Sequence, residues 1–119
     1  MKEKLQQALS LFENATKKSA NLFVVLKMDD LTDKWSVLLA SEWITEENKR
    51  KYFDEFISIL SKLLPDDEAR TIARVGIWNS NDYLAKLLMD KYKTGDQITE
   101  DEQVNGNIIH EGYIFKVNK

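Results

Sequence analysis

The spacing of apolar residues divides the chain into a series of short elements. Residues 3–19 carry apolar side chains at three- and four-residue steps, which predicts a helix with one apolar stripe. Residues 22–28 and 35–41 are rich in β-forming residues and apolar at most positions, so both are predicted to be strands. The short polar loop between them predicts an antiparallel hairpin, with at least one strand central in a sheet.

The middle of the chain begins with its strongest helical pattern. Thr45 predicts a helix N-terminus, and an apolar stripe then continues until Pro65, which is predicted to end the helix. Residues 71–78 predict a strand. Residues 82–92 predict a further helix, which we expect to stop before Gly95.

The C-terminal part combines an acidic segment with a second hairpin. Residues 96–103 contain four acidic residues and no basic one, and are predicted to form an exposed loop. Asn105 and Gly106 predict a type I′ turn. Alternating side chains over residues 107–117 predict the last strand, preceded by a short strand at residues 102–104.

The predicted order α-β-β-α-β-α-β mixes helices and strands without strict alternation. This order favours an α+β fold, with about four mostly antiparallel strands and the helices packed on one face. The 119 residues fit a single domain and are enough to bury one core. No internal repeat or linker indicates a second domain within residues 1–119.

Composition and charge narrow the classes of function. The chain is 43% hydrophobic and 31% charged, as is typical of soluble globular proteins, and has a net charge of −3. A negative total disfavours nucleic acid and anionic membranes as partners. The sequence has no cysteine, no signal-peptide-like apolar stretch near its first residues and no apolar run of membrane-spanning length. We therefore expect a cytoplasmic protein without disulfides or thiolate metal sites.

The sequence lacks the common catalytic and metal-binding motifs. His110 is the only histidine, which excludes sites that need two imidazoles, and the neighbouring Glu111 is expected on the opposite face of its strand. No serine lies in a GxSxG setting. Asp29, Asp30 and Asp33 do not have the spacing of an EF-hand loop. No cofactor or metal is predicted, and a non-enzymatic role is favoured while an enzymatic one stays open.

The polar junction after strand 71–78 has two interpretations. Asparagine and aspartate at a helix start are the residues that N-capping requires, and the junction has no glycine to bring backbone N–H groups close to a phosphate. A helix cap is therefore the favoured interpretation. The alternative is a pocket near Trp78, Asn79, Asn81 and His110 that binds a small molecule or acts on it as an enzyme.

The leading hypothesis is a protein that acts by binding another protein, as an interaction, immunity or regulatory module. Arg74 and Trp78 share one face of a strand and are residue types enriched in interfaces. An exposed strand edge would serve a partner or a second copy in a homodimer. The acidic segment would steer a basic partner electrostatically. Its carboxylates are Asp96, Glu100, Asp101 and Glu102.

Overall fold

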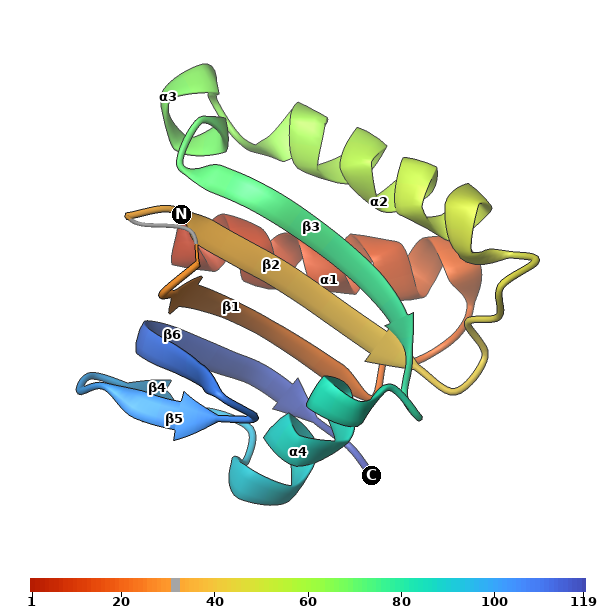
Figure 1. Ribbon diagram of the computed structural model, residues 1–119. Coiled ribbons are helices and arrows are strands. Elements are labelled where there is room, and N and C mark those ends of the chain that lie inside the picture. Colours follow the sequence, from red (N-terminus) through yellow and green to blue (C-terminus); the bar gives the residue numbers. More distant parts are fainter. Residues whose placement is uncertain (31–32) are drawn as a thin grey trace.

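The protein contains a six-stranded sheet whose centre is the N-terminal hairpin (Figure 1). The computed structural model describes residues 1–30 and 33–119. The strands are β1 (Leu22–Met28), β2 (Trp35–Ser41), β3 (Ile72–Asn79), β4 (Gln97–Ile98), β5 (Glu102–Val104) and β6 (Asn107–Val117). Their order across the sheet is β3-β2-β1-β6-β4, and β5 also pairs with β6. The mixed α+β class is confirmed, but the sheet has two strands more than the predicted four.

The helices cover both faces of the sheet. They are α1 (Lys2–Thr16), α2 (Lys49–Leu63), α3 (Asp66–Ala69) and α4 (Tyr83–Lys91). Residues of α1 and α2 enter one hydrophobic cluster and residues of α4 enter the other, so α1 lies behind the sheet in Figure 1 and α4 in front of it. The prediction that all helices pack on one face is therefore wrong.

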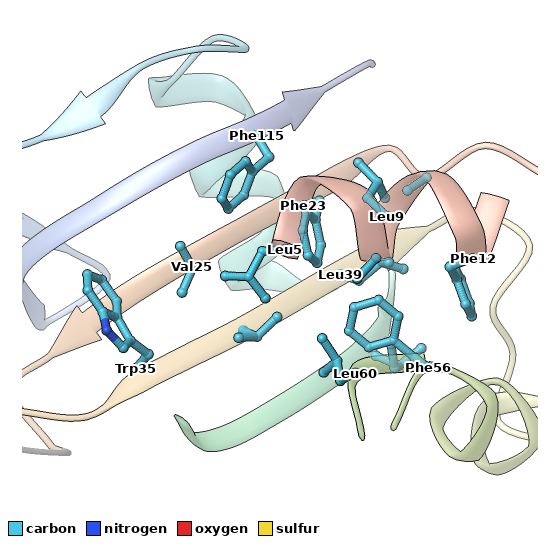
Figure 2. Packing of buried hydrophobic residues seen from close by; sticks show 14 of the residues in the cluster. Leu5, Leu9, Phe12, Phe23, Val25, Trp35, Leu39, Phe56, Leu60 and Phe115 are labelled. Carbon is cyan, nitrogen blue, oxygen red and sulfur yellow. The ribbon is translucent and has the colours of Figure 1, made fainter. Parts of the chain in front are cut away.

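The burial of the two central strands explains this arrangement. Every residue of β1 and β2 is buried except Lys27, which is half-buried. Successive side chains point to opposite faces, so Phe23 enters the α1/α2 cluster and Val24 enters the α4 cluster. In the first cluster the ring of Phe56 packs edge-on against Phe12 and Phe23, with centroids 5.3 and 5.7 Å away (Figure 2). Strands that are apolar on both faces need a helical layer on each side.

The edge strand β3 runs parallel to β2, whereas the other strand pairs of the sheet are antiparallel. Helices α2 and α3 connect the end of β2 to the start of β3. A connection of this length lets the chain return to the starting end of β2, which a parallel neighbour requires. The sheet is thus mostly antiparallel, as predicted, with one parallel pair at its edge.

Most strand positions agree with the sequence pattern. β1, β2, β5 and β6 have the predicted bounds, and Asn105 and Gly106 have φ angles of 51° and 78°, as a type I′ turn requires. The acidic segment 96–103 is not wholly a loop, since it contains β4 and the start of β5. The loop predicted between β1 and β2 includes residues 31–32, which lie outside the described residues.

Two predicted helix ends are displaced. The helix predicted from Thr45 begins at Lys49. Thr45 and Asn48 form the turn before it, where the side-chain oxygen of each accepts the backbone N–H of the other, at 2.7 and 3.2 Å. Helix α4 agrees with the predicted bounds of 82–92 to within one residue at each end, and Gly95 lies in the following turn with φ 92°. The helix predicted over residues 3–19 ends earlier, at Thr16. Both differences concern one helical turn and leave the topology unchanged.

Candidate functional site

The outer edge of β3 presents backbone groups that no neighbouring strand of the sheet uses. Within residues 1–30 and 33–119, β3 is the last strand in the order and pairs with β2 alone. The N–H of Ser80 donates to the carbonyl of Ser41 at 3.1 Å, which directs Ser80 toward β2. Backbone orientation alternates along a strand, so Trp78 also faces β2, whereas Val75 and Ile77 turn their N–H and C=O groups to the open side.

A groove runs beside this edge, between β3 and the start of α2. Its volume is about 390 Å³. Phe53 of α2 and the side chains of Val75 and Ile77, which belong to the α1/α2 cluster, form its apolar part. Trp78 also borders the groove, but its side chain packs on the α4 face of the sheet. Its charged part consists of Glu46, Lys49 and Arg50. An extended segment lying along β3 would therefore find both backbone partners and an apolar contact.

Arg74, the charged residue of β3, is turned away from the open edge. Its Nε donates to Ser36 Oγ at 3.2 Å, and its Nη1 donates to Asp30 Oδ2 at 3.1 Å. Ser36 belongs to β2 and Asp30 follows β1, so the side chain crosses toward the middle of the sheet. Proteins commonly protect edge strands with outward charges, proline or short length. β3 has eight residues and no proline, and its only irregularity against β2 is near its start.

The structure separates the predicted site residues into two groups at opposite ends of the sheet. Ala40, the β2 partner of Trp78, pairs with Leu22 at the start of β1. His110 lies beside the β6 partner of Met28, at the end of β1. The length of β1, about 20 Å, therefore lies between Trp78 and His110. Trp78, Asn79 and Asn81 fall into one group, and Arg74 and His110 into the other.

The junction after β3 caps α4 and anchors a loop. Asp82 Oδ1 accepts two backbone N–H groups in the first turn of α4, at 3.0 and 3.1 Å, so the favoured interpretation of a helix cap is confirmed. Asn79 Nδ2 donates to the carbonyl of Ile44 at 2.7 Å, and its Oδ1 accepts the N–H of Asn81 at 2.8 Å. The amide of Asn79 thus holds the loop that follows β2.

A polar hollow of about 360 Å³ lies beside this junction. Its lining includes Ser80, Asn81, Lys86, Asp90 and Lys119. The hollow is next to the carboxyl ends of the parallel strands β2 and β3, the position where α/β sheets commonly bind ligands. Of the four residues predicted for a small-molecule pocket, Asn81 lines this hollow, whereas Trp78, Asn79 and His110 do not.

His110 connects two carboxylates at the opposite end. Its Nδ1 is 2.8 Å from Asp101 Oδ1, and its Nε2 is 3.1 Å from Asp29 Oδ1. The hydrogen bond to Asp101, followed by that to Asp29, raises the pKa of His110 above its usual 6.5. Both nitrogens donate only in the protonated ring. The protonated His110 therefore links the end of β1 to the loop before β5, while Glu111 lies 3.8 Å from Lys27.

This link can be measured directly because the chain has a single histidine. We expect an NMR titration to give a pKa above 6.5 for His110, with a larger fall in Asp101→Asn than in Asp29→Asn. Since folding raises this pKa, the link stabilises the fold fully below pH 6.5 and loses its effect as pH rises through the folded-state value. His110→Gln is the control that should lose this pH dependence. A pKa at or below 6.5 would contradict the link.

The acidic residues predicted to steer a partner are largely engaged within the chain. Asp101 is bonded to the histidine. Glu102 accepts a hydrogen bond of 2.5 Å from the Tyr92 hydroxyl, and burial together with this bond raises the pKa of Tyr92 well above its usual value. Asp96 Oδ2 accepts a backbone N–H at 2.8 Å, and Glu100 is exposed. These contacts give Asp96, Asp101 and Glu102 a structural role within the chain.

Comparison with known proteins finds no matching family model, curated protein or solved structure. Over residues 1–30 and 33–119, no group of three or more histidine, aspartate or glutamate side chains is placed to hold a metal ion. No helix in this described part is both long and apolar enough to cross a bilayer. The function is therefore inferred from the edge of β3, the polar hollow and the His110 cluster.

Proposed function

We propose that this protein acts by binding another polypeptide, which adds a strand to the outer edge of β3. The observation that carries the proposal is an eight-residue edge strand without proline, whose charged side chain is held inward by Ser36 and Asp30. Val75 and Ile77 supply the backbone donors and acceptors, and Phe53 supplies an apolar contact in the groove. This describes a non-enzymatic interaction, immunity or regulatory module.

The physical basis of this binding is backbone pairing supported by side-chain burial. Strand addition gains main-chain hydrogen bonds that do not depend on the partner's sequence, and the groove beside Phe53 then selects among partner side chains. The exposed Glu100 would add electrostatic steering of a basic partner. The absence of cysteine is compatible with a reducing compartment, and we propose a cytoplasmic location for this role.

Replacing Val75 with proline tests the edge while preserving the internal ladder. The N–H of Val75 faces the open side, so proline removes a donor that only a bound strand would use. Loss of one hydrogen bond of about 1–1.5 kcal/mol predicts about tenfold weaker partner binding. The measurement is native mass spectrometry of untagged protein purified gently from its host, with wild type and variant compared side by side.

Two further variants make this experiment specific. Val75→Lys keeps the N–H and the packing of the side-chain stem but places a charge at the edge, so we expect it to weaken binding as well. Asn81→Ala lies at the polar hollow and should retain the partner. All three variants should keep the far-UV circular dichroism spectrum of the wild type. A partner retained equally by both Val75 variants would contradict the proposed function.

The polar hollow supports a second candidate, the binding of a small polar molecule or, less favoured, enzymatic action on one. The hollow lies at the ends of the parallel strands β2 and β3. It combines the ammonium groups of Lys86 and Lys119 with the side chains of Asn81 and Asp90. In this case the purified protein would carry a reproducible small mass. Lys86→Ala would lose that mass, and Val75→Pro would keep it, so the two candidates give opposite results.

A further inference from the structure

We infer that the strand added to β3 is β3 of a second copy of this chain, paired antiparallel about a two-fold axis at Gly76. This inference rests on the proposed function, because it uses the same edge and names its occupant. The edge is suited to self-pairing because its outward-facing residues, Val75 and Ile77, lie symmetrically on either side of Gly76. A two-fold axis needs such a self-complementary surface.

The backbone orientation of β3 restricts the register of this pairing. In an antiparallel pair, two residues that exchange both hydrogen bonds must both face the shared edge. With the axis at Gly76, Val75 of one copy lies opposite Ile77 of the other, and both residues face that edge. Gly76 then lies opposite its own copy in a non-hydrogen-bonded pair, where the strands approach most closely.

The absence of a side chain at Gly76 makes room for the Trp78 ring of the same chain. A Cβ atom at Gly76 would lie 3.1 Å from Cε2 of Trp78 and 3.0 Å from Leu38 Cδ2, so the indole ring lies over the glycine backbone. In the two-fold pair the opposing Cα atoms are about 4.5 Å apart, which brings the two Trp78 rings together. Partly exposed tryptophan at the centre of an interface is a common source of binding energy.

Charge complementarity on the other face favours a second copy over a strand of one sign. Phe53, Gly76 and Arg50 all line the groove, and Arg50 pairs with Asp54 on α2. Their side chains are 85% and 61% exposed and 3.2 Å apart. The two-fold axis makes the two α2 helices antiparallel, which sets Arg50 of one copy toward Asp54 of the other. The formal charges of Glu46, Lys49, Arg50 and Asp54 cancel, so this surface gives a strongly acidic or basic strand no net attraction.

The register can be tested by disulfide formation, because the chain has no cysteine of its own. With the axis at Gly76, Arg74 of one copy lies opposite Trp78 of the other in a non-hydrogen-bonded pair, within the reach of a disulfide. We expect an equimolar mixture of Arg74→Cys and Trp78→Cys to form a linked dimer under mild oxidation, while neither variant alone does so. Equal linkage in the single variants would overturn this register.

Sedimentation velocity over a range of concentrations tests the association itself. We expect wild type to form a dimer. Val75→Pro should raise the dissociation constant of the dimer about a hundredfold, because each of the two copies loses one hydrogen bond at the interface. Val75→Lys, which keeps the side-chain packing, should also be monomeric. Wild type that stays monomeric at every concentration would overturn self-pairing, and so would a dimer that persists in both variants without the mixed disulfide.

These outcomes separate the inference from the proposed function. If wild type is monomeric but a different polypeptide co-purifies with it and is lost in Val75→Pro, self-pairing fails and strand addition at β3 stands. If co-purifying polypeptides are unaffected by both Val75 variants, strand addition itself fails.

Discussion

Replacing Phe56 with alanine is expected to lower the free energy of unfolding by about 3–5 kcal/mol, because it removes a ring from the place where two helices and the sheet meet. Phe56 has no exposed surface, and its ring packs against Phe12 of α1 and Phe23 of β1 (Figure 2). Two helices and the sheet surround the resulting cavity, so the site cannot collapse readily to fill it. Chemical denaturation followed by circular dichroism measures this loss.

Phe53→Ala on the same helix is the matched control for this prediction. Phe53 is partly buried at the rim of the groove, so its replacement should cost less than that of Phe56. Similar losses in the two variants would contradict the packing described for α2. The comparison also bears on function, since Phe56 holds α2 over the sheet and thereby places Phe53 beside β3.

Local sequence patterns were sufficient to predict most of the strands. Alternating or continuous apolar residues mark 22–28, 35–41 and 107–117, and the Asn105-Gly106 turn fixes the short strand before it. These signals are local, because they depend on side-chain alternation and on backbone angles of neighbouring residues. β4 has only two residues, Gln97 and Ile98, which is too short for such a pattern to be recognised in an acidic segment.

The sequence indicated the placement of the helices on both faces of the sheet only in part. Val24 and Leu26 are as deeply buried as Phe23 and Val25, so the continuous apolar run of β1 was a signal for helices on both faces. The helix between β2 and β3 was likewise a signal for a parallel pair. The order of helices and strands, taken alone, favoured a fold with all helices on one face of the sheet.

The candidate sites depend on side-chain directions and on strand register. His110 contacts Asp101, nine positions away, and Asp29, 81 positions away. The pairing of β6 with β5 brings Asp101 to the ring, and the pairing of β6 with β1 brings Asp29 to it. The open edge of β3 depends on the inward direction of Arg74, which its contacts with Ser36 and Asp30 determine. The contacts of His110 and of Arg74 join residues that are far apart in the chain and follow no regular spacing. The sequence therefore indicated His110 and Arg74 as candidate residues but did not show which side chains they contact.

Amide hydrogen exchange at β3 tests most directly whether this edge binds a strand. The amides of Arg74 and Trp78 face β2 and should be protected in the monomer as well as in the assembly, which makes them internal controls. The amides of Val75 and Ile77 face the open side, so their protection reports a bound strand. Val75→Lys, measured under the same conditions, supplies the unbound reference for Ile77.

In the assembled wild-type protein we predict that the Val75 and Ile77 amides exchange at least about a hundredfold more slowly than in the dilute monomer, while the Arg74 and Trp78 amides change little. That result would establish strand addition at the outer edge of β3. Unchanged exchange at Val75 and Ile77 in a protein that is demonstrably associated would contradict it, and would place the interaction surface elsewhere on the molecule.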